Sequence, residues 1–443
     1  MSTSTKGATS VAPQKVRLGG RVWSSLIVVG LVGQLAWTVE NMYLNVFVYN
    51  TITDDPNVLA ILVAASAITA TIATLVIGAA SDRAQRRRIF ISVGYILWGL
   101  STATFGFVSV EGISSIVSVG DAVVVAILAI VLLDCLMSFF GAGANDAAFN
   151  AWVTESTVPS NRGRVDSVLA IMPLIAMLVI FGGFDGLTQA GQWREFFMTI
   201  GLTTAAIGVL AWFLIRDAPK MQPNSDGYLR SVVHGLRPSA IRANPDLYLT
   251  LVVYAIVGTC TQVFLPYLII YIQRYLRIDG YAIVLGTVLI AASVLSVLGG
   301  RVIDRVGKLQ FMIPAAGILA LGLVLMFFAR GMLIVILAGI VMMTGFMLAI
   351  ASVSATVRDF TPPDRVGSVQ GLRMIFAIMI PMVVGPFIGA AVIIGANETY
   401  LELGVIKQVP TPWIFLAAAA LLILMVWPVR VLQKRQLTKV QSA

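Results

Sequence analysis

Residues 300–308 read Gly-Arg-Val-Ile-Asp-Arg-Val-Gly-Lys, and residues 78–88 read Gly-Ala-Ala-Ser-Asp-Arg-Ala-Gln-Arg-Arg-Arg. Both stretches have the form G-x-x-x-D-R followed by basic residues, and both follow a long apolar segment. A second pair of stretches, 155–163 and 359–367, shares an acid, a proline, an arginine and a glycine in that order. Because each pair occupies equivalent places in the chain, the sequence predicts a protein built as two similar halves.

The composition places these halves in a membrane. Of the 443 residues, 58% are hydrophobic and 12% are charged, whereas a soluble domain has about 25% charged residues. The apolar residues form runs of roughly 20 or more, the length that crosses a bilayer. We therefore predict an all-α integral membrane protein with twelve transmembrane helices in two pseudo-symmetric six-helix bundles. The predicted helices lie near 22–50, 57–81, 88–110, 121–156, 165–189, 195–215, 246–275, 281–303, 309–329, 332–357, 366–395 and 410–432.

Five regions follow from this pattern. They are a polar tail at 1–21, a first bundle at 22–215, a charged central linker at 216–245, a second bundle at 246–432 and a tail at 433–443. The first apolar stretch is too long for a signal peptide and lacks a small-residue cleavage site, so we interpret it as a membrane helix. Cys135 and Cys260 both lie inside apolar runs, which favours packing roles over a disulfide.

The basic residues predict the orientation, because positive loops stay in the cytoplasm. With a cytoplasmic N-terminus, only five of the 30 Lys and Arg residues fall on the outer side: Arg194, Arg274, Arg277, Arg330 and Lys407. This distribution predicts a cell (cytoplasmic) membrane protein with both termini in the cytoplasm. The net charge of +9 is spread over the loops, so it does not indicate a nucleic-acid partner.

The paired motifs resemble those of the major facilitator superfamily, whose hallmark loop between the second and third helices reads G-x-x-x-D-R-x-G-R/K-R/K. A weaker copy of that loop lies between the eighth and ninth helices of the family. The resemblance covers nearly the whole chain and implies a secondary transporter with the major facilitator fold. The first-half copy has Gln85 where the family has glycine, so its turn can differ.

The acids and arginines of these loops predict a conformational latch on the cytoplasmic side. A carboxylate at a helix end can pair with an arginine next to a neighbouring helix of the same half, and such pairs break when the halves rock. The alternative is that positive charge only anchors the topology. The predicted latch residues are Gly78, Asp82, Arg83, Arg87, Glu155, Arg162, Gly300, Asp304, Arg305, Gly307, Lys308, Asp359 and Arg365.

Three acids lie well inside predicted helices, where a charge costs ~2.5–3.5 kcal/mol and usually faces a cavity or a partner. These coupling-ion candidates are Glu40, Asp134 and Asp146. Asp146 is about 13 Å from the helix end near Glu155, and its segment resembles the fourth helix of glycoside–cation symporters, whose aspartate helps bind the cation. The acidic pair that those sodium users carry in the second helix is missing here, which favours coupling to a proton gradient. No cofactor is expected. The alternative is an aspartate satisfied by Asn145 and Asn150.

Polar residues at helical spacing predict a solute site. In the first helix they recur every three or four residues on one face, which indicates either a cavity lining or helix-to-helix hydrogen bonds. The seventh helix adds amide and aromatic groups around Pro266, and some of its tyrosines fit an interfacial belt equally well. Arg373 either meets a cavity acid or an anionic substrate, or snorkels to the cytoplasm. The predicted solute-binding residues are Gln34, Trp37, Asn41, Asn45, Asn145, Asn150, Gln262, Tyr267 and Arg373.

Several function classes are disfavoured. The chain has no phosphate-cradling G-x-x-x-x-G-K-S/T motif, and its one histidine, His234, lies in the predicted linker, so neither an ATP-driven pump nor an enzyme is expected.

Three interpretations remain. The first is proton-coupled uptake of a small-molecule solute such as a sugar or glycoside, by a lipid-embedded chain that works as a monomer. The second is a proton-coupled exporter of amphipathic drugs or lipids. Against it, the drug antiporters' G-x-x-x-G-P-x-x-G-G signature is reduced to Gly182-Gly183 in the fifth helix. The third, a non-transporting receptor or scaffold, leaves the intramembrane acids unexplained.

Overall fold

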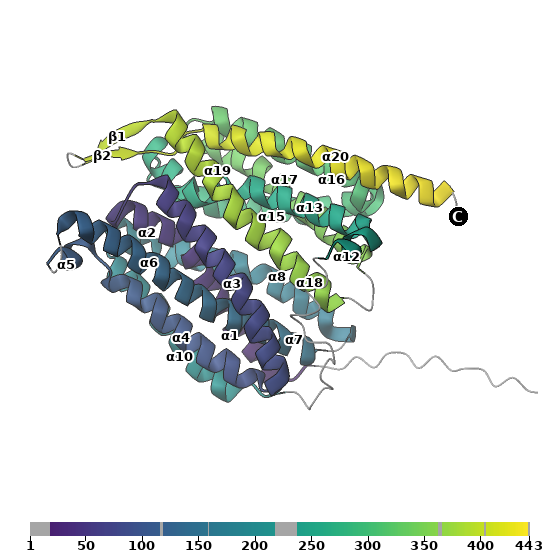
Figure 1. The fold of residues 1–443 in the computed structure, drawn as a ribbon, viewed down its shortest axis with the longest axis horizontal. Coiled ribbons are helices and arrows are strands. Elements are labelled where there is room, and N and C mark those ends of the chain that lie inside the picture. Colours follow the sequence, from purple (N-terminus) through teal and green to yellow (C-terminus); the bar gives the residue numbers. More distant parts are fainter. Residues whose placement is uncertain are drawn as a thin grey trace, which may run out of the picture.

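The computed structural model describes residues 18–115, 118–157, 159–217, 237–361, 366–402 and 405–441. Within these ranges the chain forms long helices and one two-stranded antiparallel hairpin (Figure 1). Eleven described helices are long and apolar enough to cross a bilayer, and a shorter apolar helix, Ser167–Gly183, lies where we predict the fifth span. The predicted all-α membrane fold is confirmed.

Six spans make up the first half, several of them interrupted by short turns of another helix type. In order, the elements are α1 (Gly20–Thr38), the π-helix η1 (Val39–Tyr43) and α2 (Leu44–Thr51); α3 (Pro56–Ala84); α4 (Arg87–Thr104) and η2 (Phe105–Phe107); α5 (Val110–Ser114); α6 (Val119–Gly141), the π-helix η3 (Ala142–Phe149) and α7 (Asn150–Glu155); α8 (Pro159–Gly183); α9 (Asp185–Gln189); and α10 (Trp193–Leu214).

The second half has a matching set of spans and ends with the hairpin and a long last helix. Its elements are α12 (Pro238–Ala243); α13 (Pro245–Gln262), η4 (Leu265–Tyr267), α14 (Leu268–Ile270) and the π-helix η5 (Tyr271–Tyr275); α15 (Tyr281–Val306); α16 (Lys308–Phe328); α17 (Met332–Asp359); α18 (Val366–Met374), the π-helix η7 (Ile375–Met379) and α19 (Ile380–Ala396); β1 (Thr399–Glu402) and β2 (Val405–Gln408); and α20 (Trp413–Gln441).

Small residues allow the closest helix pairs within the halves. Gly99 in α4 faces Gly201 in α10, and a Cβ on either glycine would collide with the backbone of the other helix. In the second half, Gly322 of α16 lies against the backbone of α17 at Met342 in the same way. The two halves meet along α3 with α19 and along α8 with α15. The space between them is therefore bounded by helices of both halves.

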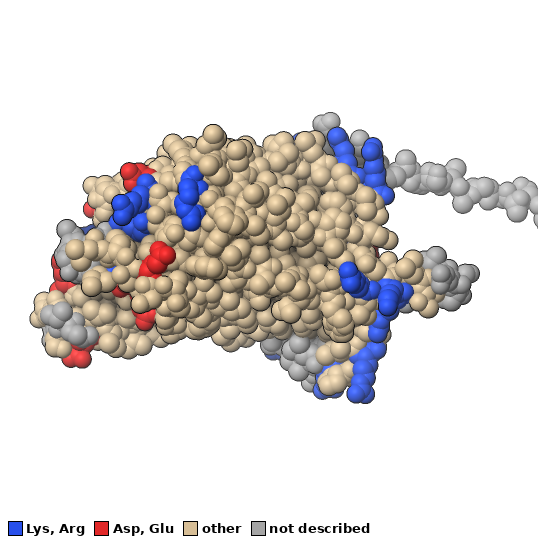
Figure 2. Space-filling model, turned by 90° about the horizontal axis from the view of Figure 1, so that it is seen from above, with Lys and Arg blue, Asp and Glu red and all other residues tan. Residues whose placement is uncertain are grey.

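The molecule has two distinct ends. We call the end where α1 begins and α20 finishes the terminal end, and the opposite end, with β1 and β2, the hairpin end (Figure 1). On the face drawn in Figure 2, the charged side chains lie toward the two ends and the middle is uncharged. This distribution fits a protein whose middle is surrounded by lipid.

Some predicted boundaries differ from the observed ones. The predicted helix 165–189 is two elements, because α8 stops at Gly183 before the short α9, and glycine is a poor helix former. The predicted end at 432 is wrong, since α20 continues to Gln441. The hairpin was not predicted, although Thr399, Tyr400 and Ile406 are strand-forming residues. Most of the predicted linker, residues 218–236, lies outside the described residues.

Candidate functional site

A cavity of about 350 Å³ lies between the two halves. The second half provides most of its wall, and the first half contributes Asn41, Met42 and Met177. Aliphatic and methionine side chains dominate the lining, including Met326, Met342, Met343, Leu265, Leu268, Leu285, Leu289, Val284, Val288 and Ile350. Polar groups in the lining come from Asn41, Tyr254, Thr261 and Gln262. Asn41 and Gln262 are thus the predicted solute-binding residues that the structure places on this cavity.

The polar stripe predicted along the first helix is divided by the π-helix η1. A π-turn bonds residues five apart and so changes the direction of the following side chains. Trp37, before the turn, packs against Trp98 with ring centroids 5.1 Å apart. Asn41 is exposed to the cavity, whereas Asn45, after the turn, is buried and its Oδ1 has no hydrogen-bond partner within the described ranges. Gln34 is half-buried, so the four residues do not share one cavity face.

Tyr267 connects structural elements instead of lining the cavity. Its hydroxyl lies 3.0 Å from the carbonyl oxygen of Pro56 in α3 and 2.9 Å from that of Pro386 in α19. Gly389 leaves room for the Tyr267 ring, because a Cβ there would press on that ring. The hydroxyl therefore helps to hold the two halves together.

Two of the three predicted coupling acids are buried next to serines in the first half. Ser138 of α6 donates a hydrogen bond of 2.6 Å to Glu40 Oε1. Asp134 lies one turn earlier in α6, on the same helical face as Ser138, and only 1% of it is exposed. Within the described ranges, Glu40 Oε2 and Asp134 Oδ1 have no hydrogen-bond partner. Each of these oxygens would be costly to bury as a charge, and a bound proton removes that cost.

Asp146 lies in η3, beside the buried Asn145. The Asn145 amide donates to Asp146 Oδ1 at 2.9 Å, and its Oδ1 lies 2.8 Å from the hydroxyl of Tyr95. Asn150 is exposed, and its amide reaches the backbone carbonyl of Asp146 at 3.2 Å. The Asn145 side chain is thus hydrogen-bonded to both Tyr95 and Asp146. Asp146 itself is half-buried.

At the terminal end of the first half, Arg87 joins three elements. Its Nη2 lies 2.7 Å from Glu155 Oε1, its Nη1 lies 2.5 Å from Ser81 Oγ, and it also pairs with Asp82. Only 7% of Arg87 is exposed. These contacts tie α4 to α3 and to α7 of the same half, which is the arrangement expected for the latch.

The turn before this cluster keeps the shape that glycine favours. Gln85 has φ +49°, in the left-handed region, and ends α3 where the family motif has glycine. Its equivalent in the second half, Gly307, also has positive φ, at +99°. The substitution of glycine by Gln85 therefore leaves a left-handed turn. Arg83, just before this turn, is exposed to solvent.

The equivalent cluster of the second half is more exposed. Lys308 Nζ lies 2.7 Å from Asp359 Oδ2, with side chains 40% and 53% exposed. Arg305 is exposed, and a Cβ on Gly300 would meet nothing within 4 Å, whereas one on Gly78 would touch Ala147. Of the remaining predicted latch residues, Arg365 and the side chains of Arg162 and Asp304 lie outside the described residues.

An aspartate that was not predicted joins the two halves near the hairpin end. Asp185, at the start of α9, is 3% exposed and accepts hydrogen bonds at Oδ1 from Tyr43 of the first half, at 2.9 Å, and from Tyr281 of the second half. Gln189 donates to its Oδ2 at 2.5 Å. A polar residue between Gly182-Gly183 and the next apolar run was the available sequence signal, but its partners are distant in sequence. We call Asp185, Tyr43 and Tyr281 the hairpin-end gate.

Further bonds between the halves lie at the same end. Arg274 Nη2 is 3.0 Å from Asn50 Oδ1, and the Tyr49 hydroxyl donates to the carbonyl of Gln408 in the hairpin at 2.5 Å. The backbone N–H of Gln408 in turn donates to Asp54 Oδ2 at 2.6 Å. The inter-half hydrogen bonds of Tyr49, Asp54, Arg274 and Tyr281 thus all lie on this side of the molecule. The halves are therefore closed at the hairpin end.

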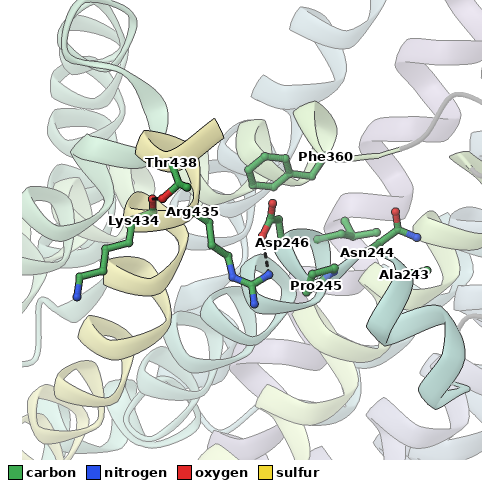
Figure 3. A pocket seen from close by; sticks show the side chains of 9 residues that line it. Ala243, Asn244, Pro245, Asp246, Phe360, Lys434, Arg435 and Thr438 are labelled. Atoms are coloured by element: carbon green, nitrogen blue, oxygen red, sulfur yellow. Dashed lines mark hydrogen bonds and ion pairs between the residues drawn. The ribbon is translucent and has the colours of Figure 1, made fainter. Parts of the chain in front are cut away.

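A second pocket, of about 560 Å³, lies at the terminal end of the second half (Figure 3). It is lined by Asn244 and Asp246 at the start of α13, Phe360 after α17, and Arg435 of α20. Arg435 Nη1 lies 3.3 Å from Asp246 Oδ1 and links the last helix to α13. Because this pocket is formed by one half, it lies off the path between the halves. Among the described side chains, no group of three or more His, Cys, Asp or Glu could hold a metal ion.

The arrangement is similar to several solved transporters. The nucleoside transporter NupG has a TM-score of 0.69 at 14% identity, over 94% of this chain and 100% of its own. A bacterial homologue of the human lysosomal transporter Spinster, inward-facing and unoccupied, has a TM-score of 0.66 at 14% identity, over 93% and 94%. The partially occluded inward-open xylose transporter XylE from E. coli has 0.64 at 15%, over 92% and 98%. No curated protein sequence matches the chain.

At these identities the solved structures show a shared fold. The family evidence comes from the sequence, because the Major Facilitator Superfamily model matches residues 26–386, with a further match over 254–442. The resemblance of the paired loop motifs is thereby confirmed, and the protein is a multi-pass membrane transporter, not an enzyme. The chain belongs to the Major Facilitator Superfamily.

Proposed function

We propose that the chain moves an amphipathic, largely apolar solute by alternating access, driven by protons. The observation that carries this proposal is the lining of the central cavity, which is mostly aliphatic and methionine side chains. Methionine is flexible and polarisable, and it suits solutes of varied shape. A sugar needs a polar partner for most of its hydroxyls. Only four of the described lining residues offer polar side chains, which is few for such a solute. The cavity thus favours the predicted alternative over the sugar or glycoside.

The buried acids of the first half support proton coupling. Glu40 and Asp134 each have one carboxyl oxygen with no hydrogen-bond partner among the described residues. Adding or removing a proton strongly changes the cost of burying such a group. Glu40 lies in the same π-turn as Asn41 and Met42, which line the cavity, and as Tyr43 of the hairpin-end gate. Protonation of Glu40 is therefore placed to affect both the solute and the gate. Asp146, the leading candidate from the sequence, is the alternative proton site.

The proposed placement follows the positive loops. We propose a cell-membrane protein whose terminal end faces the cytoplasm and whose hairpin end faces outward, which makes the structure closed on the outer side. Each chain holds both halves around one cavity, so we propose that it works as a monomer.

The polar alternative has one supporting observation. Asn41 and Gln262 place two amides on the cavity wall from opposite halves, and amides can bind sugar or nucleoside hydroxyls. The solute classes therefore have to be compared directly.

The test is uptake into proteoliposomes under an imposed proton gradient, with a fluorescent amphiphile, xylose and uridine as separate probes. We expect accumulation of the amphiphile, and loss of that accumulation when Met343→Trp fills the cavity. Leu333→Trp, which adds similar bulk to a side chain 69% exposed on the outside of α17, is the matched control. Accumulation of xylose or uridine instead of the amphiphile would refute the proposal. Glu40→Gln should abolish uphill accumulation while leaving exchange, and unchanged accumulation would exclude Glu40 from coupling.

A further inference from the structure

Arg373 forms no ion pair with a described carboxylate of its own half. It lies seven residues into α18, roughly 10 Å from the start of that helix. The second-half helices contain acids only near their ends, such as Asp246 in α13 and Asp359 in α17. A charged side chain in this position is costly unless it faces a cavity, water or a partner.

The contacts of Arg373 are with neutral groups. Its Nη2 lies 2.9 Å from Ser354 Oγ and 3.2 Å from the Tyr254 hydroxyl, and its guanidinium carbon is 5.5 Å from the centre of the Tyr254 ring. No carboxylate of the described residues forms an ion pair with it. A guanidinium has five N–H donors, so donors on Nε and Nη1 remain for a ligand. The two hydroxyls fix the group in position without neutralising it.

Arg373 is not itself a lining residue of the apolar cavity, but its guanidinium lies directly behind one. Tyr254, its hydrogen-bond partner, lines the cavity. Ala377, four residues after Arg373, and Ile350, four residues before Ser354, also line the cavity. A snorkelling arginine would extend toward the terminal end, whereas this one is hydrogen-bonded beside the cavity wall.

We infer that Arg373 binds the head group of an amphipathic anion, a carboxylate or a phosphate ester, whose apolar tail occupies the methionine-lined cavity. This inference rests on the proposed function and names its solute class. Arginine binds such oxyanions through two parallel N–H···O bonds, and the apolar walls provide no competing positive group. The apolar cavity and the guanidinium behind its Tyr254 wall thus match a single-tailed anionic amphiphile.

The experiment measures binding of radiolabelled oleate and of oleyl alcohol to the full chain in lipid nanodiscs. The two probes share a tail and differ in the charge of the head group. We expect the chain to bind oleate more tightly than oleyl alcohol, and Arg373→Gln to weaken oleate binding roughly 10- to 100-fold while changing oleyl alcohol binding less than about threefold. Arg358→Gln, an exposed arginine at the end of α17, is the control and should change neither.

Other outcomes separate the two proposals. Equal binding of both probes, unaffected by Arg373→Gln, would overturn the head-group site and leave an amphipathic solute in place. Binding of neither probe would overturn both proposals. Arg373→Lys keeps the charge without the paired donors, so it should keep part of the preference for oleate. If Arg373→Gln fails to fold, the comparison of the unsubstituted chain with Arg373→Lys decides, and identical preference in these two chains would refute bidentate recognition.

Discussion

The geometry of the hairpin-end gate predicts how strongly the Tyr281 hydroxyl stabilises the state that is closed at the hairpin end. Tyr281 of the second half donates to Asp185 of the first, and 1% of Tyr281 is exposed. Tyr281→Phe removes that donor and keeps the packed ring. A hydrogen bond to a carboxylate contributes about 1.5–3 kcal/mol, and each 1.4 kcal/mol is tenfold in an equilibrium constant. The variant should therefore raise the population open at the hairpin end roughly 10- to 150-fold.

A labelling rate measures this population even when it is rare. Ile272 lines the cavity near the hairpin end and is 1% exposed, so Ile272→Cys reacts with a membrane-impermeant maleimide from that side only when the gate opens. The assay uses proteoliposomes and a background in which Cys135 and Cys260 are alanine. In Tyr281→Phe, the labelling rate of the introduced cysteine should rise by the same factor as the open population, roughly 10- to 150-fold.

Tyr95→Phe is the matched control for this gate. The Tyr95 hydroxyl is also buried, but its partners, Asn145 Oδ1 and the Val29 carbonyl, lie in its own half. Tyr95→Phe removes these hydrogen bonds inside the first half and leaves the bonds between the two halves intact. Equal labelling rates in Tyr281→Phe and the unsubstituted chain, or an equal acceleration in Tyr95→Phe, would refute the reasoning.

Three further predictions concern stability, measured as thermal unfolding in detergent. Arg87→Gln should destabilise the first half by about 3 kcal/mol or more, because it leaves the Glu155 carboxylate of a largely buried ion pair without its partner; an unchanged midpoint would contradict this. Lys308→Gln breaks an exposed ion pair and should lower the free energy of unfolding by less than about 1 kcal/mol. A destabilisation as large as that of Arg87→Gln would show that burial does not set the difference between the two pairs. Gly99→Leu should separate α4 from α10 at a cost of about 1–3 kcal/mol, whereas Gly300→Ala, with open space around the new methyl group, should be neutral or stabilising; the reverse order would show that the predicted contacts are absent.

The candidate site was only partly predictable, and the first helix shows why. The spacing of Gln34, Trp37, Asn41 and Asn45 predicts one polar face if the helix is regular. The π-helix η1 changes the phase inside that run, so Asn41 reaches the cavity and Asn45 is buried. A period of 3.6 residues in the sequence contains no signal for a single wider turn, because that turn is stabilised by the surrounding packing.

The gate was missed for a different reason. Asp185 stands in a short connection after two glycines, where a polar residue is ordinary, and nothing local in the sequence relates it to Tyr43 or Tyr281. Its importance comes from burial between two halves that are joined by a long linker. The Arg87 cluster, in contrast, was predicted because its acids and arginines follow repeated motifs at helix ends.

The sequence by itself determined the membrane class, the two-fold repeat and the family of this protein. Apolar runs of bilayer length, sparse charge and duplicated loop motifs are properties of the chain read in order, since lipid requires each spanning segment to satisfy its own backbone hydrogen bonds. Only the tertiary structure decided which polar groups meet. It placed Arg373 against Tyr254 of the cavity wall, Asp185 between the halves and Tyr267 on two carbonyls. These contacts depend on how distant helices pack and on where their turns deviate from regular geometry.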